Sequence, residues 1–103
     1  MEPVSRYGKL TAKPGKGDEL AAILLKAADD LADDPGCLLY MVNRQKDAPD
    51  TIWVTELWRS QDELDVVLAR IRGGEQTTAT MALVEGGEMV ELELLGGKGA
   101  HTA

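Results

Sequence analysis

The carboxylate of Glu56 is the group of this chain best suited to acid–base chemistry. In the period-two alternation of a strand, Glu56 shares one face with Val54 and Trp58. A carboxylate that is withdrawn from water among apolar neighbours can act as a general base toward a bound substrate. The competing and favoured interpretation is a structural ion pair with Arg6 or Arg44, or a contact across a dimer, because buried charges are usually paired.

Two polar side chains of the preceding strand are further catalytic candidates. Tyr40 and Asn43 offer a hydroxyl and an amide to a substrate oxygen, and Tyr7 on the first strand is a similar candidate for substrate binding. For each of them, a hydrogen bond with a purely structural role is the more common use of such a group.

Two indoles complete the candidate substrate contacts. Trp53 and Trp58 lie five positions apart, so a strand directs them to opposite faces. One is expected to pack beneath helices, and a flat aromatic ligand could stack on the other. Core or interface packing is the more frequent role of tryptophan and is the favoured alternative for each.

Charge and composition exclude several classes of partner and cofactor. The net charge of −7 disfavours nucleic acid and anionic membranes, which require a basic patch. The one cysteine, Cys37, and the one histidine, His101, form no pair at metal-ligand spacing, and no nicotinamide or flavin motif is present, so we expect no metal and no cofactor. No run of apolar residues is long enough for a signal peptide or a membrane span, and a single cysteine suits a cytoplasmic protein.

Hydropathy and turn residues predict four strands and three helices. The chain order is strand, helix, strand, strand, helix, a further short helix, and strand. The second long helix begins at a capping box, Ser60 to Glu63, and ends before Gly73. The predicted strands are residues 4–12, 37–44, 51–58 and 88–95, and the other two predicted helices are residues 17–32 and 75–83.

This order is that of a split βαβ unit, which predicts an α+β, ferredoxin-like domain with a four-stranded antiparallel sheet. Its two main helices can cover only one face of that sheet. In strand 37–44 alternation directs Tyr40 to one face and Cys37 and Met41 to the other, so neither face is polar. An uncovered apolar face predicts a homodimer whose sheets pack face to face and enclose a pocket. We expect one domain over residues 1–95 and a disordered, glycine-rich tail over residues 96–103.

Three sequence blocks, in the right order, resemble the antibiotic biosynthesis monooxygenase (ABM) family. They are Lys13–Leu20, Asp34–Tyr40 and Ile52–Ser60, the last similar to a Glu-x-Trp-x-Ser segment of that family. The resemblance covers roughly residues 5 to 95. It implies a dimeric α+β barrel. Many members are cofactor-independent oxygenases of quinol-like or polyketide compounds, whereas others degrade heme or handle small signalling molecules.

The chain departs from the family at positions that bear on chemistry. Many members carry a histidine on the second helix where this chain has Val67, which makes Val67 a candidate substrate contact instead. The heme-degrading branch uses an Asn, a Trp and a His where this chain has Gly8, Val67 and Thr77, and His101 lies in the tail. Heme ligation is therefore not expected.

These observations leave three functional hypotheses. The first is a cofactor-independent monooxygenase that oxidises a quinol-like aromatic or polyketide-type molecule with O2. The second is a non-catalytic, small-molecule-binding or regulatory dimer of the same fold, favoured by the absent helix histidine. The third is an isomerase or lyase that uses Glu56 as its base.

Overall fold

A single antiparallel sheet organises the computed structural model, which describes residues 2–99. Its strands lie in the order β2-β3-β1-β4, and every neighbouring pair is antiparallel. This order confirms the predicted α+β, ferredoxin-like arrangement. The elements in chain order are β1 (Val4–Ala12), α1 (Gly17–Asp30), β2 (Cys37–Arg44), β3 (Thr51–Trp58), α2 (Gln61–Ile71), α3 (Glu75–Leu83) and β4 (Val84–Glu93).

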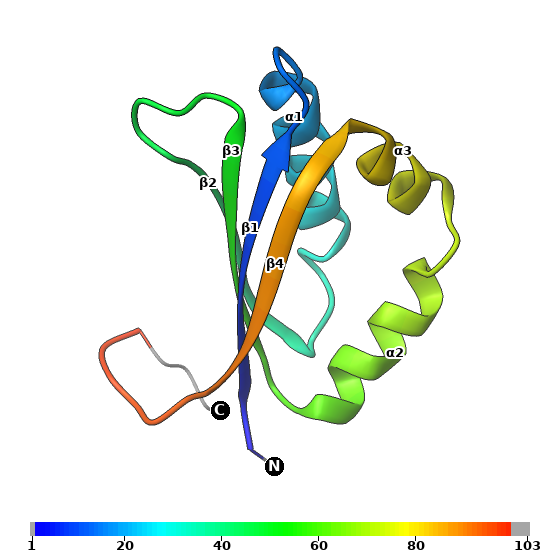
Figure 1. The fold of residues 1–103 in the computed structure, drawn as a ribbon. Helices are drawn as coiled ribbons and strands as arrows, with labels where there is room; N and C mark the ends of the chain where they lie inside the picture. Colours follow the sequence, from blue (N-terminus) through cyan, green and yellow to red (C-terminus); the bar gives the residue numbers. More distant parts are fainter. Residues whose placement is uncertain (1, 100–103) are drawn as a thin grey trace.

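All three helices lie on one side of the sheet, and no further element among residues 2–99 covers the other side (Figure 1). The apolar stripes of α1 and α2 meet the sheet in two clusters of buried side chains, as the periodicity predicted. Burial of these side chains is the main source of stability for a domain of this size. The first cluster holds Ala12, Leu20, Leu24, Ile52 and Val54, and the second holds Leu31, Trp58, Leu64 and Val67.

Most predicted element bounds are confirmed, but those of β4 were wrong. The strand begins at Val84 and ends at Glu93, whereas the sequence pattern predicted residues 88–95. Gly86 and Gly87 do not form a turn before the strand; they continue it and pair with Thr11 and Leu10. A side chain at position 87 would meet Leu10 Cδ2 at 2.8 Å, so glycine allows this close pairing. Helix α1 ends at Asp30 and not at residue 32.

A register shift in β2 overturns the predicted face of Cys37. Simple alternation directs Cys37 to the uncovered face together with Leu39 and Met41. In the structure the pairing with β3 shifts between Cys37 and Leu39, so that Cys37 pairs with Trp58. Cys37 consequently packs against the buried cluster beneath the helices. An irregularity of this kind reverses the side-chain alternation, which a period-two pattern cannot foresee.

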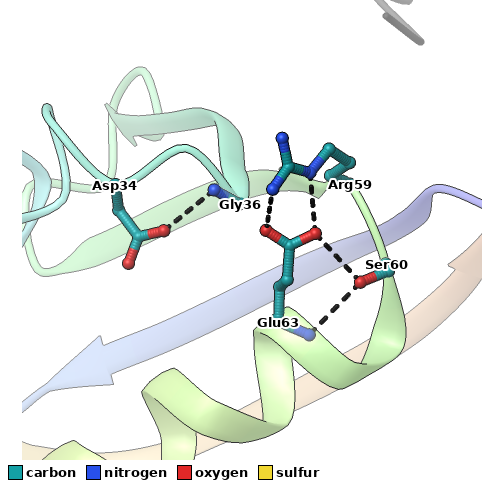
Figure 2. A network of polar contacts seen from close by, with 5 residues as sticks. All are labelled: Asp34, Gly36, Arg59, Ser60 and Glu63. Atoms are coloured by element: carbon teal, nitrogen blue, oxygen red, sulfur yellow. Dashed lines mark hydrogen bonds and ion pairs between the residues drawn. The ribbon is translucent and has the colours of Figure 1, made fainter.

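A polar network fixes the start of α2, beside the loop that precedes β2 (Figure 2). Glu63 accepts hydrogen bonds of 2.7 and 2.6 Å from Nε and Nη2 of Arg59, and these bonds lower the pKa of the Glu63 carboxyl. Ser60 Oγ accepts from the Glu63 amide at 3.3 Å and donates to its carboxylate at 3.1 Å. The predicted N-cap at Ser60 is thus confirmed, but the Glu63 carboxylate is held by Arg59 and by Ser60 Oγ and not by the Ser60 amide, as a capping box would have it.

Beyond β4, residues 94–99 have no regular secondary structure. The predicted disorder of residues 96–103 stays a prediction, since residues 100–103, including His101, lie outside the described residues. In the described part of the chain, no helix is both long enough and apolar enough to cross a membrane.

Candidate functional site

One row of polar side chains crosses the helix-covered face of the sheet. The strand register places Tyr40 of β2 opposite Glu56 of β3, Glu56 opposite Arg6 of β1, and Arg6 opposite Glu91 of β4. Directly opposed residues of antiparallel strands project to the same face, so these four side chains form one line. We call Tyr40, Glu56, Arg6 and Glu91 the polar row.

A cleft of about 420 Å³ lies between the polar row and the helices. This volume falls within the range of typical small-molecule sites, roughly 300–1,000 Å³. The cleft combines an apolar wall with a few convergent polar groups, as such sites usually do. The sheet contributes Arg6, Tyr40, Glu56, Trp58 and Met89, and the helices contribute residues that include Ala27, Asp30, Leu31, Val67, Arg70 and Gln76.

Glu56 is held at the base of this cleft and is only 5% exposed. Its Oε1 accepts a hydrogen bond of 2.9 Å from the indole nitrogen of Trp58 and lies 3.6 Å from Nη1 of Arg6. The predicted ion pair with Arg6 is therefore confirmed. The alternative partner, Arg44, instead donates to Asp18 at 2.7 Å. Glu56 thus forms a structural ion pair with Arg6 and also lines the cleft.

Tyr40 lines the same cleft, and its hydroxyl is a donor at neutral pH. Burial, and then the nearby charge of Glu56, raise the pKa of Tyr40 to about 12. The hydroxyl therefore keeps its proton over the physiological range and can donate a hydrogen bond to an oxygen of a bound molecule.

A second cleft of about 190 Å³ adjoins the first. The two share Ala27, Tyr40, Ile71 and Gln76 as lining residues. Gln76 is held at this junction because its side-chain amide donates to the carbonyl oxygen of Ile23 at 3.1 Å, which also ties α3 to α1. The first cleft is lined by residues of the polar row, and the second is lined mostly by apolar groups and includes residues of α3.

Three predicted site residues do not lie in this cleft. Tyr7, Asn43 and Trp53 project from the uncovered face of the sheet, on the side away from the helices. There the rings of Tyr7 and Trp53 lie 5.8 Å apart, and the indole nitrogen of Trp53 donates to Gln45 at 2.9 Å. The prediction that the two tryptophans occupy opposite faces is confirmed, and Trp58 is the one beneath the helices.

Val67 lies on α2, the second long helix that the sequence predicts. It is 4% exposed, belongs to the second buried cluster and lines the cleft from α2. Its apolar side chain supplies no proton donor or acceptor where other family members are expected to carry histidine. Any acid–base chemistry in the cleft must therefore come from other lining residues, which are Arg6, Tyr40 and Glu56 on the sheet and Asp30 and Arg70 on the helices.

Sequence reasoning missed Arg6 as a site residue in its own right. It appeared only as a possible partner of Glu56, because its role depends on the pairing of β1 with β3 and β4, strands far apart in sequence. One signal in the sequence could have identified Arg6. It shares a strand face with Gly8, Leu10 and Ala12, which are small or apolar, so a charged side chain is unexpected there.

Comparison with known proteins agrees with this architecture. The family profile described as antibiotic biosynthesis monooxygenase matches residues 3–69. A candidate antibiotic biosynthesis monooxygenase from Chloroflexus aurantiacus J-10-fl is 33% identical in sequence to this chain. Its crystal structure matches with a TM-score of 0.81, and the match covers 94% of this chain and 97% of that one. None of the curated protein sequences compared with the chain matches it.

Two further structures extend the similarity. A candidate antibiotic biosynthesis monooxygenase from Deinococcus radiodurans is 25% identical with a TM-score of 0.79, covering 88% of this chain and 91% of that one. SnoaB, a cofactor-independent oxygenase from Streptomyces nogalater, is 19% identical with a TM-score of 0.82, covering 96% of this chain and 99% of that one, and it shares the fold. The profile match over most of the chain and the one-third identity to the Chloroflexus protein show that this chain belongs to the antibiotic biosynthesis monooxygenase family.

Proposed function

We propose that this protein is a cofactor-independent monooxygenase that oxidises a quinol-like aromatic or polyketide-type molecule with O2 in the cleft above the polar row. The observation that carries the proposal is the convergence of Glu56, Tyr40 and Arg6 on the sheet side of a largely apolar cleft of about 420 Å³. Membership in the family supports oxygenase chemistry, and the shared fold with SnoaB, a cofactor-independent oxygenase, supports catalysis without a cofactor.

The proposed reaction needs only the substrate, O2 and the side chains of the polar row. Glu56 takes a proton from the activated carbon or hydroxyl of the substrate, and Tyr40 donates a hydrogen bond to the resulting oxyanion. The carbanion passes one electron to O2, and the substrate radical and superoxide combine into a hydroperoxide after proton uptake. Loss of water then leaves a carbonyl. For an anthrone, one oxygen atom enters the product and the other leaves as water, with both reducing electrons supplied by the substrate.

Oxygen consumption tests this proposal directly. The purified protein is incubated aerobically with a panel of anthrones and quinols while O2 uptake and product formation are followed. We expect uptake that matches quinone formation mole for mole with an anthrone and that falls at least tenfold in Glu56→Gln, because a general base contributes roughly 10²–10⁴-fold. No uptake above a boiled control across the whole panel would count against the proposal. The same variant tests the isomerase or lyase hypothesis, which predicts substrate conversion without O2 uptake.

A non-catalytic binding protein is the second candidate, and the position of Val67 favours it. An apolar residue occupies the cleft wall where a helix histidine is expected in other members, while the cleft keeps the size of a ligand site. This candidate predicts that the same aromatic compounds raise the unfolding temperature without O2 uptake or product formation. Turnover of any compound in the panel would exclude it.

The uncovered face of the sheet supports a homodimer. Large apolar side chains stay exposed there, including Tyr7, Met41, Val90 and Leu92. Packing two such faces against each other would remove them from water and would enclose Trp53, Asn43 and Tyr7 between the two sheets. Light scattering coupled to size-exclusion chromatography should give twice the mass of the 11.1 kDa chain. A monomer at all accessible concentrations would contradict this part of the proposal.

A further inference from the structure

Helix α3 borders both clefts but is not held by a buried face of its own. In the described part of the chain, none of its nine residues is buried. Its half-buried residues share one face of the helix and are Gln76, Thr77, Thr80 and Leu83. Three of these four are polar, whereas the inward faces of α1 and α2 bury leucine and valine side chains. Turning this face of α3 toward water therefore costs little free energy.

The carboxyl end of α3 is anchored to the sheet. The carbonyl oxygen of Leu83 accepts a hydrogen bond of 2.8 Å from the amide of Lys13, which follows β1. The Leu83 side chain packs against the first buried cluster, and the chain continues directly into β4 at Val84. This end of the helix is therefore fixed in position.

The amino end of α3 is joined to the other helices by two side-chain hydrogen bonds. Gln76 donates to the carbonyl oxygen of Ile23 on α1 at 3.1 Å, and Thr77 Oγ1 donates to that of Ile71 on α2 at 2.8 Å. The helix follows Gly73, whose φ of 76° lies in the left-handed region that glycine adopts easily. Water can replace both bonds, so this is the end of the helix that can move.

Release of these bonds would also unwind the amino half of α3. A helix of nine residues is too short to be stable by itself in water, where about 12–15 residues are needed. Its three threonines have a low helix propensity and weaken it further. The helical state of α3 thus depends on its contacts with α1 and α2.

The movable half of α3 forms part of the cleft walls. Four of the nine residues that line the second cleft belong to α3, namely Gln76, Thr77, Thr80 and Met81, and Gln76 lines the first cleft as well. Displacement of this half would therefore widen the second cleft and, at Gln76, the first.

We propose that α3 is a lid that opens about its anchored end at Leu83 to admit a ligand and closes through the hydrogen bonds of Gln76 and Thr77. The inference rests on the proposed function for the choice of the cleft, and it adds how that cleft is entered. Closure of the lid excludes water from the cleft, which suits a reaction that passes through a carbanion and a radical.

Amide hydrogen exchange of the free, unaltered protein is the first test. Exchange is followed by nuclear magnetic resonance for each residue and is corrected for intrinsic rates. We expect residues 79–83 of α3 to exchange about tenfold or more faster than residues 65–70 of α2, a helix of similar length that buries Leu64 and Val67. Equal protection of the two helices would overturn the inference, because a lid must open more often than the body that it covers.

Entry to the clefts is measured by alkylation of a cysteine placed inside them. Ala27 lines both clefts, whereas Ala28, the next residue of α1, lines neither. Ala27→Cys and Ala28→Cys are each combined with Cys37→Ala and treated with N-ethylmaleimide. Thr77→Val keeps the shape of the side chain but removes its donor. It should speed alkylation at position 27 roughly threefold to tenfold, the effect of one lost hydrogen bond, and leave position 28 unchanged.

Thr78→Val is the matched control for this variant. The Thr78 hydroxyl is exposed and donates to the carbonyl oxygen of Gly74 at 3.2 Å, so its loss does not release α3 from α1 or α2. This control should leave alkylation unchanged at both positions. Equal rates at position 27 in Thr77→Val and Thr78→Val would contradict the lid, as would an equal gain at position 28, which would indicate general loosening of the fold.

A ligand separates the lid from the oxygenase proposal. Anthrone is added to the unaltered protein under nitrogen, at ten times its dissociation constant, so that it binds without being oxidised. Exchange in α3 should then slow about tenfold relative to exchange in α2. Unchanged exchange in α3 with anthrone bound would overturn the inference. Failure of anthrone to bind, or to be oxidised in air, would count against the proposed function, while the results on the free protein decide the lid by themselves.

Discussion

The indole nitrogen of Trp58 donates a hydrogen bond of 2.9 Å to Oε1 of Glu56, and both side chains are buried on the same face of β3. The bond gives the buried carboxylate a neutral donor in addition to the charge of Arg6 at 3.6 Å. It also fixes the side-chain direction of Glu56 in the cleft, because Trp58 is itself packed among the residues of the second buried cluster.

Replacing this donor should destabilise the fold. Trp58→Phe keeps an aromatic ring but removes the indole N–H, so the free energy of unfolding should fall by about 1.5–3 kcal/mol, the range for a hydrogen bond to a charged group. Urea denaturation followed by circular dichroism measures the loss. Trp53→Phe makes the same change on the uncovered face, where the indole bonds to exposed Gln45, and should cost clearly less. Equal losses in the two variants would contradict the assigned role of Trp58.

The Tyr40 hydroxyl should lose its proton only at high pH, and this should make the stability of the fold depend on pH above about 10. Burial and then the charge of Glu56 raise the pKa of Tyr40 from 10.0 to about 12. The unfolded chain therefore loses the Tyr40 proton first as pH rises. Stability from this residue is complete below about pH 10 and is lost as pH approaches about 12. Ultraviolet titration of tyrosinate should show a step near pH 12 that is absent in Tyr40→Phe, and this variant should also lose less stability between pH 10 and 12. A single tyrosine step near pH 10 would refute the prediction.

Cys37 should react slowly with alkylating agents. Burial, and then the charge of Glu56, raise the pKa of the Cys37 thiol from 9.0 to about 11. The thiolate is the reactive form, so its fraction near neutral pH should be about a hundredfold lower than for an ordinary cysteine. Mass spectrometry after iodoacetamide treatment should show little modification in the native protein and rapid modification in urea. Equal rates in the two conditions would place Cys37 on an accessible surface, contrary to its position after the register shift.

Gly36 should not tolerate a side chain. A Cβ atom at this position would meet Oε2 and Cβ of Glu63 at 2.5 and 2.7 Å, inside the network that fixes the start of α2. Gly36→Ala should therefore lower the free energy of unfolding by about 1–3 kcal/mol, as overpacking usually does. Gly86→Ala is the control, because nothing lies within 4 Å of a Cβ at that position. Thermal unfolding of both variants measures the difference, and equal unfolding temperatures would contradict the packing argument.

A charge on the uncovered face should separate the proposed dimer. Met41 projects from β2 on this face and is half exposed in the single chain. Met41→Lys would bury two like charges when the sheets pack together, so light scattering should show a monomer. Met81→Lys places the same charge on α3, on the other side of the sheet, and should leave the mass unchanged (Figure 1). A dimer that persists in Met41→Lys would point to a different interface.

Local sequence pattern was sufficient for the elements but not for the site. Alternation and turn residues predicted β1, β2, β3 and α3 with their observed bounds, because each depends on neighbours along the chain. The face of Cys37 and the start of β4 at Val84 depend on pairing between strands and could not be obtained in that way. The same holds for the site: Glu56 was identified from its own strand, whereas the place of Arg6 beside it depends on the pairing of β1 with β3.

The separation of the two tryptophans across the sheet has a practical consequence. Trp58 lines the cleft, whereas Trp53 lies beside Tyr7 on the uncovered face. Because indole emission responds to its immediate surroundings, a chain with only Trp58 would report ligand occupancy, and a chain with only Trp53 would report association of the sheets. The protein thus contains two intrinsic fluorophores, each placed to follow one of the two events that its function is proposed to need.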